Sequence, residues 1–227
     1  MIRAILVLLA LSAPARAEYL LGNLRFTLLH ELGHAVIDQY GVALFGPEEI
    51  AADGFAIVLG DHLLDEAEMA AMIRAVTRLG RREAARELFD PWGDYMPGGQ
   101  RLAYALCLYH GLRPEGRAAL ARALGMPSDR AEACEVQARR VRAAWAPVLA
   151  EMTDRKGAGR LRPGRGKTLR LLAKDFARIE RMLSLRRDLP VIEEVCTEDN
   201  AFYYHLDERI AFCIEMLDAL RGGGAEH

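Results

Sequence analysis

The sequence has little net charge, no long apolar run and no closely spaced cysteine pair. Its 30 Lys and Arg residues nearly balance its 32 Asp and Glu residues, which leaves a formal charge of −2. A nucleic-acid-binding surface is normally electropositive, so this balance argues against a nucleic-acid partner. None of the four cysteines lies in a C-x-x-C pair, which argues against a cysteine-rich zinc site. No internal repeat is visible.

The chain does contain the run His30-Glu31-Leu32-Gly33-His34. Residues four apart on a helix share a face, so His30 and His34 can present ring nitrogens to one divalent metal ion. Glu31 lies beside that ion and is placed to take a proton from a water molecule there, as the general base of an H-E-x-x-H metalloprotease does. Gly33 leaves room beside the metal.

A catalytic zinc site usually has three protein ligands and keeps one position for water or substrate. Glu49, which opens a second apolar run, is our candidate for the third ligand. Asp53 shares its face and can accept the N–H of a ligating histidine, which fixes the orientation of that ring. Glu48 is a rival by proximity, but only Glu49 has an aspartate four residues ahead.

The alternative interpretation is that the two histidines lie on an exposed helix face. Both acids would then be ordinary first-turn residues that the helix dipole favours. This alternative does not explain why the two sequence elements occur together.

H-E-L-G-H followed by E-x-x-x-D resembles the gluzincin metallopeptidases, the thermolysin-like clan. The longer strings L-L-H-E-L-G-H-A-V-I-D, E-E-I-A-A-D, G-Q-R-L-A-Y-A-L-C-L-Y-H-G, N-A-F-Y and I-A-F-C-I-E resemble a bacterial family of secreted metallopeptidases of unassigned substrate. The resemblance covers the chain from Gly22 to about Leu220, apart from the basic stretch near residues 155–168. It implies zinc as the cofactor. The zinc ligands would be His30, His34 and Glu49, with Glu31 as the base and Asp53 as the brace.

The expected fold class is α+β and mostly α, with a zincin-like helical body and a small C-terminal β-sheet packed by the active-site helix. With 227 residues, 52% of them hydrophobic, residues 18–227 can form a single domain with one core. We expect helices at about residues 20–40, 47–64, 66–89, 99–111, 114–124, 128–150 and 168–187, and short strands at 191–196, 201–204 and 209–213. Residues 154–167 are basic and Gly-rich and lack aromatics, so we interpret them as a flexible linker rather than a polyanion-binding site.

The first 17 residues have the pattern of a secretory signal peptide. A positive start is followed by an apolar stretch, residues 4–11, and by an A-x-A site at Ala15-Arg16-Ala17. The apolar stretch is short for a membrane span, so a retained anchor is the less favoured alternative. Cleavage would leave a chain that begins at Glu18 and has a formal charge of −4. We therefore expect an exported protein, periplasmic or secreted, with no stable membrane anchor.

The four cysteines of an exported protein predict two disulfides, which four residues can form in three ways. We favour Cys107 with Cys134 and Cys196 with Cys213. Free buried thiols are the alternative, because burial is common for cysteine.

A peptidase of this type usually holds its substrate extended along a sheet edge beside the metal. Only twelve residues would precede His30 in the mature chain, too few to form a sheet, so we expect the C-terminal strands to fold back against the active-site helix. The segment 200–203 would then form part of the cleft. The alternative is a core hairpin with Phe202 and Phe212 packed inward, and the sequence does not choose between the two.

The donor that would stabilise a tetrahedral oxyanion is not evident from the sequence. Tyr203 and His205 are preferred as catalytic candidates because they border the expected edge strand. Tyr204, Tyr109, His110 and Arg101 remain alternatives. The histidine-bearing downstream domain of thermolysin-like enzymes has no recognisable equivalent here.

These observations predict a zinc-dependent peptidase of the cell envelope that acts on a peptide or protein substrate. Two alternatives stay open: an inactive zinc-binding interaction module, and a zinc amidase that acts on cell-wall peptides. The presence of Glu31 argues against the inactive module, since a scaffold has no chemical need for that base. The sequence gives neither the cleavage preference nor the oligomeric state.

Overall fold

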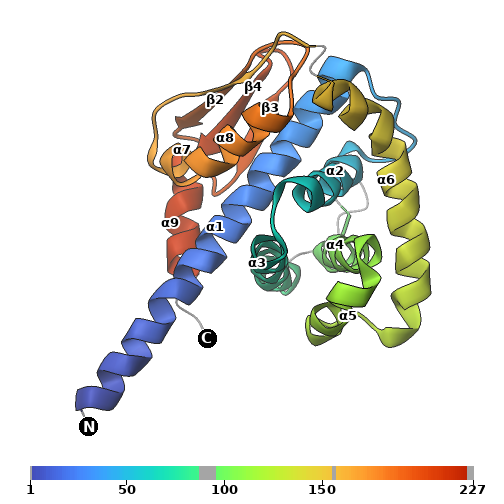
Figure 1. Cartoon of the computed structure of the whole chain (residues 1–227). Coiled ribbons are helices and arrows are strands. Elements are labelled where there is room, and N and C mark those ends of the chain that lie inside the picture. Colours follow the sequence, from blue (N-terminus) through green and yellow to red (C-terminus); the bar gives the residue numbers. More distant parts are fainter. Residues whose placement is uncertain (1, 87–95, 155–156, 224–227) are drawn as a thin grey trace.

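The computed structural model describes residues 2–86, 96–154 and 157–223, and helices dominate it (Figure 1). The α-helices are α1 (Ile2–Tyr40), α2 (Glu48–Leu63), α3 (Glu66–Ala84), α4 (Gly98–Leu112), α5 (Pro114–Ala123), α6 (Ala131–Thr153), α7 (Lys167–Leu171), α8 (Ala173–Met182) and α9 (Ile214–Gly223). A 3-10 turn, Ser128–Arg130, precedes α6. The strands are β1 (Leu161–Pro163), β2 (Leu189–Glu194), β3 (Ala201–Tyr204) and β4 (Arg209–Cys213). The expected mostly-α member of the α+β class is confirmed.

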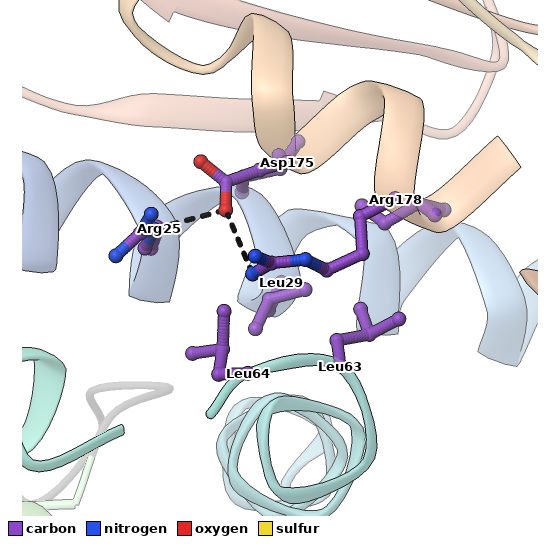
Figure 2. Close-up of a pocket in the computed structure, with 8 residues that line it drawn as sticks. Arg25, Leu29, Leu63, Leu64, Asp175 and Arg178 are labelled. Carbon is purple, nitrogen blue, oxygen red and sulfur yellow. Dashed lines mark hydrogen bonds and ion pairs between the residues drawn. The ribbon is translucent and has the colours of Figure 1, made fainter. Parts of the chain in front are cut away.

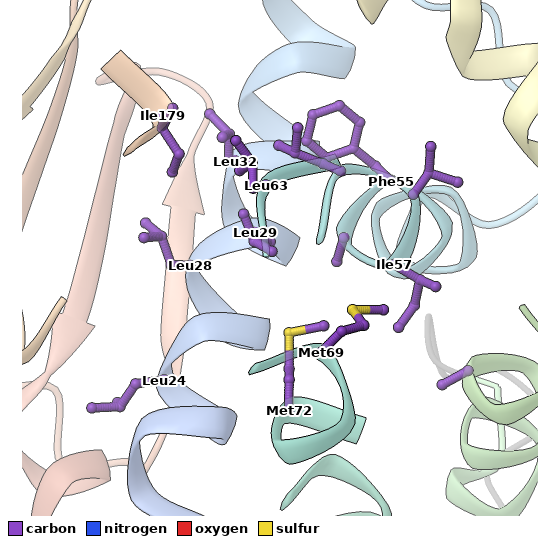
Figure 3. Packing of buried hydrophobic residues seen from close by; sticks show 14 of the residues in the cluster. Leu24, Leu28, Leu29, Leu32, Phe55, Ile57, Leu63, Met69, Met72 and Ile179 are labelled. Atoms are coloured by element: carbon purple, nitrogen blue, oxygen red, sulfur yellow. The ribbon is translucent and has the colours of Figure 1, made fainter. Parts of the chain in front are cut away.

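The long helix α1 runs between the sheet, which lies together with α7, α8 and α9, and the helices α2 to α5 (Figure 1). Between Tyr19 and Ile37 most of its apolar side chains are buried, so the H-E-L-G-H run lies in a part of the helix that solvent barely reaches. Leu28 points toward Ile179 of α8, while Leu29 lies near Met72 of α3 (Figure 3). Burial of each such side chain contributes about 1.5–3 kcal/mol. The core therefore packs α1 against α8 on one side and against α3 on the other.

Charged side chains also join α1 to α8, as Figure 2 shows, and to α3. Arg25 of α1 donates to Asp175 of α8 over 2.9 Å and to Glu68 of α3 over 3.1 Å. Arg178 of α8 donates to the same Glu68 over 2.9 Å. Most of these groups are shielded from water, so the pairs retain more of their attraction than surface pairs do.

The four strands form one sheet in the order β1-β2-β4-β3. β1 and β2 pair in parallel, as do β2 and β4, whereas β3 runs antiparallel to β4 with Phe202 opposite Ala211. β3 is therefore an edge strand of the described sheet, and it packs beside α1. The C-terminal strands do fold back against the helix that carries the H-E-L-G-H run.

The prediction of a flexible linker at residues 154–167 is wrong where β1 forms. Gly159 and Leu185 exchange backbone hydrogen bonds of 2.9 Å, and Asp188 accepts one from the Arg160 N–H. A Cβ at Gly159 would overlap the backbone of Arg187. These glycines thus permit close approach of two chain segments, although their composition resembles that of a flexible linker. Residues 155–156 of that stretch lie outside the described residues.

Other boundaries differ from expectation. α1 begins at Ile2, so the expected signal segment continues the helix, while residue 1 lies outside the described part. The expected helix 168–187 is two helices with a turn at Leu172. The helix expected at residues 66–89 is α3, which ends at Ala84. Residues 87–89 lie outside the described residues. α9 follows β4 directly and was not expected.

Both favoured disulfides are present. Cys107 of α4 is bonded to Cys134 of α6, and Cys196, just after β2, is bonded to Cys213 of β4. Among the described residues, no helix is both long enough and apolar enough to cross a membrane.

Candidate metal centre

The close crossing of α1 and α2 places the H-E-L-G-H run against the start of α2. Gly33 lies against Ala52, and a Cβ on Gly33 would be 3.0 Å from the Ala52 Cα. The space at Gly33 therefore accommodates α2, not the metal as we expected. Pro47 is the N-cap of α2, and Glu48 and Glu49 occupy its first turn, where the helix dipole favours acidic side chains. The crossing brings those two acids to the two histidines.

Three side chains converge at this crossing. The His30 Nε2 and His34 Nε2 atoms lie 3.2 Å apart. The Glu49 carboxylate is 3.1 Å from His30 Nε2 and 3.5 Å from His34 Nε2. A tetrahedral ion with ligand bonds of about 2.0–2.1 Å separates its ligand atoms by about 3.3 Å. The spacing of the three side chains fits a divalent ion such as zinc.

The other ring nitrogen of each histidine faces a carboxylate. His30 Nδ1 lies 2.8 Å from Asp53 Oδ1, within reach for that carboxylate to orient the ring. His34 Nδ1 lies 2.7 Å from Glu48 Oε1. Glu48 is thus no rival to Glu49 in this arrangement but its complement, since the two adjacent acids reach opposite nitrogens of the same ring.

Arg101 of α4 completes the arrangement behind His30. It donates two hydrogen bonds of 2.8 Å to the two oxygens of Asp53. We had considered Arg101 only as an oxyanion donor, and the structure instead joins it to the brace. Arg101 and Asp53 are 48 positions apart, so no local pattern reveals the pair.

The electrostatics of the cluster favour a cation. Burial by itself raises the pKa of Glu49, but hydrogen bonds with the two histidines outweigh it and lower this pKa to about 2. Burial lowers the pKa of His30, yet Asp53 and Glu49 outweigh that effect and raise the pKa to about 9. The carboxylates thus stabilise positive charge at the ring nitrogens, whether a proton or a metal ion supplies it.

Glu31 lies between the histidines and the sheet. Its side chain is buried, and burial raises its pKa to about 7 against the opposing effect of the histidines. The backbone of Tyr203 lies close to its carboxylate and also lowers this pKa. A carboxyl group with a pKa near neutral is suited to accept and release a proton at physiological pH.

The backbone of β3 is oriented by its pairing with β4. The Asn200 carbonyl accepts a hydrogen bond of 3.0 Å from the Cys213 N–H. The backbone groups of Asn200 and of every second residue after it therefore point toward β4. Ala201 and Tyr203 alternate with these residues. Their backbone N–H and C=O groups therefore point away from β4, toward the outer edge of the sheet, where Glu31 lies. Phe212 is fully buried, but Phe202 is only half-buried and points to the opposite face of the sheet, so the core hairpin with both rings packed inward is wrong.

The two preferred oxyanion donors have different surroundings. The Tyr203 hydroxyl donates a hydrogen bond of 2.6 Å to Asp38, so the phenol is engaged one turn beyond His34 on α1. His205 is exposed, and its Nε2 lies 3.9 Å from Glu48 Oε1. The Tyr109 hydroxyl donates to Glu66, away from the cluster. Of the candidates, His205 is the one next to the cluster with an accessible ring.

The comparison with protein families agrees with this site. The chain belongs to the DUF4344 family, whose model carries the description "Putative metallopeptidase" and matches residues 10–149. The match includes α1 and α2, and so the whole candidate centre. A metallopeptidase family implies a metal cofactor. No curated protein and no solved structure matches the chain.

Proposed function

We propose that the protein is a zinc-dependent peptidase of the cell envelope, with a gluzincin-type site. The observation that carries the proposal is the spacing of 3.1–3.5 Å among His30, His34 and Glu49. Imidazole and carboxylate are ligand types that suit zinc. The two disulfides, together with the expected signal peptide, favour an exported protein.

A bound zinc ion would polarise the scissile carbonyl and make a nearby water molecule more acidic. Glu31 accepts the proton of that water molecule and later delivers it to the leaving amine. Asp53 and Glu48 hold the two imidazoles in the orientation that turns both Nε2 atoms toward Glu49. Arg101 in turn keeps the Asp53 carboxylate ionised and fixed.

The edge of β3 supplies the means to bind a peptide. The outward-facing backbone groups of Ala201 and Tyr203 can pair with an extended substrate, as in β-augmentation. Such pairing places a peptide carbonyl beside Glu31, because Tyr203 already contacts that carboxylate. His205, at the end of this strand, is the proposed donor to the developing oxyanion.

Glu31→Gln in the purified protein tests the proposal. We expect peptide hydrolysis to vanish while elemental analysis still finds one zinc ion per chain, because the variant removes the base and keeps the ligands. Glu132→Gln, on the exposed side of α6, is the matched control and should leave both unchanged. Residual hydrolysis equal to that of the native protein would contradict the assignment and indicate a contaminant.

Parallel assays with a peptide library and with cell-wall fragments define the substrate. Cleavage of general peptides supports the peptidase proposal, whereas cleavage confined to cell-wall peptide links would replace it with the amidase alternative. A native protein that binds zinc yet cleaves neither would favour the inactive interaction module.

A further inference from the structure

Positive charge is concentrated in one short part of the chain. Residues 160–181 contain eight Lys and Arg residues and two acidic residues, although the whole chain has a formal charge of −2. This stretch comprises β1, α7 and α8, and α8 lies beside β1. Residues 160–167 of the expected linker therefore belong to a locally basic part of the fold.

The cations of this stretch are mostly exposed and uncompensated. Arg178 turns inward to Glu68, and Asp175 is buried against Arg25. Of the exposed cations that form no ion pair within the described residues, five lie between residues 165 and 181: Arg165, Lys167, Arg170, Lys174 and Arg181. We call these five residues the basic face. Lys167 and Arg170 lie three residues apart on α7, and Lys174 and Arg181 lie seven residues apart on α8, so each pair shares a face of its own helix.

An exposed apolar side chain ends each of these two helices. Leu171 and Met182 have 43% and 38% of their surface exposed, and they belong to a group of only six exposed large hydrophobic residues in the described chain. Phe176 and Ile179, on the other side of α8, are buried in the core. Exposed cations with apolar neighbours on a helical surface are typical of segments that bind anionic lipid bilayers.

We propose that the basic face docks the protein on an anionic phospholipid surface, as a peripheral contact. The face has no exposed aromatic side chain on which bases could stack, which disfavours single-stranded nucleic acid. The exposed Leu171 and Met182 favour a bilayer over a soluble polyanion, because only a bilayer offers an apolar layer beneath its charges. This inference is independent of the metal centre and holds whether or not the protein is a peptidase.

Sedimentation with vesicles tests the proposal. The protein lacking residues 1–17 is mixed with vesicles of phosphatidylcholine, with or without phosphatidylglycerol. We expect binding only to the anionic vesicles and a loss of binding as salt increases. The double variant R170E/K174E should bind at least 25-fold more weakly, since each cation near the surface contributes about fivefold. The control R122E/R140E changes two exposed arginines outside the face and should lose much less.

Two further measurements separate the outcomes. Leu171→Ser should weaken vesicle binding and leave binding to soluble polyphosphate unchanged. If polyphosphate competes fully and Leu171→Ser has no effect on vesicles, the partner is a soluble polyanion and the proposal is overturned. Equal binding to neutral vesicles, or equal loss in the control variant, also overturns it. R170Q/K174Q replaces the charge reversal if circular dichroism shows that R170E/K174E is unfolded.

Discussion

Gly33 of α1 lies directly against Ala52 of α2, and this contact sets how closely the two halves of the candidate metal centre approach. A Cβ at position 33 would be 3.0 Å from the Ala52 Cα and 3.3 Å from its Cβ. His34 follows Gly33, and Asp53 follows Ala52. Any separation of the helices at this point therefore moves the histidines away from the acids.

Gly33→Ala should weaken zinc binding and lower stability. The added methyl group forces the backbones apart by a few tenths of an ångström, and overpacking of this kind costs about 1–3 kcal/mol. Isothermal titration with zinc and thermal unfolding measure the two effects. Gly116→Ala is the control, because its Cβ would meet nothing within 4 Å and alanine favours the α5 helix by up to about 1 kcal/mol. Equal effects of the two substitutions would show that the crossing does not limit metal binding.

Arg101→Met should lower zinc affinity by about 10–100-fold, the usual loss when a partner behind the ligands is removed. The substitution leaves the Asp53 carboxylate without its two donors, so His30 loses a fixed orientation. Competition with a chelating dye measures the zinc dissociation constant.

Arg113→Met is the matched control for Arg101→Met. Arg113 donates over 2.8 Å to Asp61, which lies two turns beyond Asp53 on the same helix. This control should lower stability slightly and leave zinc affinity unchanged. If it reduced zinc affinity as much as Arg101→Met, the effect would be a general loosening of α2.

His205→Ala should reduce kcat by about 10²–10³-fold with little change in bound zinc, which is the loss expected for one oxyanion donor. Tyr203→Phe should cost much less, because the phenol that it removes is engaged by Asp38. Steady-state kinetics on a peptide that the native protein cleaves give both values. The reverse order would move the proposed donor role from His205 to Tyr203.

The sequence predicted the two elements of the candidate centre because each one is a helical spacing. His30 with His34, and Glu49 with Asp53, are both pairs four residues apart, and such pairs share a face in any helix. The roles of Glu48 and Arg101 depend instead on how three helices cross. Spacing singles out Glu49 through its partner Asp53, but it does not indicate the contact of Glu48 with His34 Nδ1, and Arg101 comes from a helix far along the chain.

The main error in the fold came from glycine. Residues 157–166 look like a linker because their glycines and charges are typical of one, but Gly159 is required where two backbones meet. Single-sequence patterns report the freedom of a glycine and not the neighbour that makes it necessary. The strands β2, β3 and β4 were easier to predict, because they are short runs with β-branched and aromatic residues and polar turns separate them.

Glu68 should make the attachment of α1 sensitive to acid. Burial raises its pKa, but hydrogen bonds from Arg178 and from the Asp65 backbone outweigh burial and lower the pKa below its ordinary value of 4.5. A carboxyl group with a lowered pKa in the folded state stabilises the fold above the unfolded value, and that stabilisation is lost as the pH falls through the folded value. Glu68→Gln should therefore destabilise the protein at pH 7 and differ little from the native chain near pH 2. Urea unfolding at both pH values measures this, with Glu115→Gln on the exposed side of α5 as the control. If the difference in the free energy of unfolding between Glu68→Gln and the native chain were the same at both pH values, the carboxylate charge would not be what holds α3 to α1 and α8.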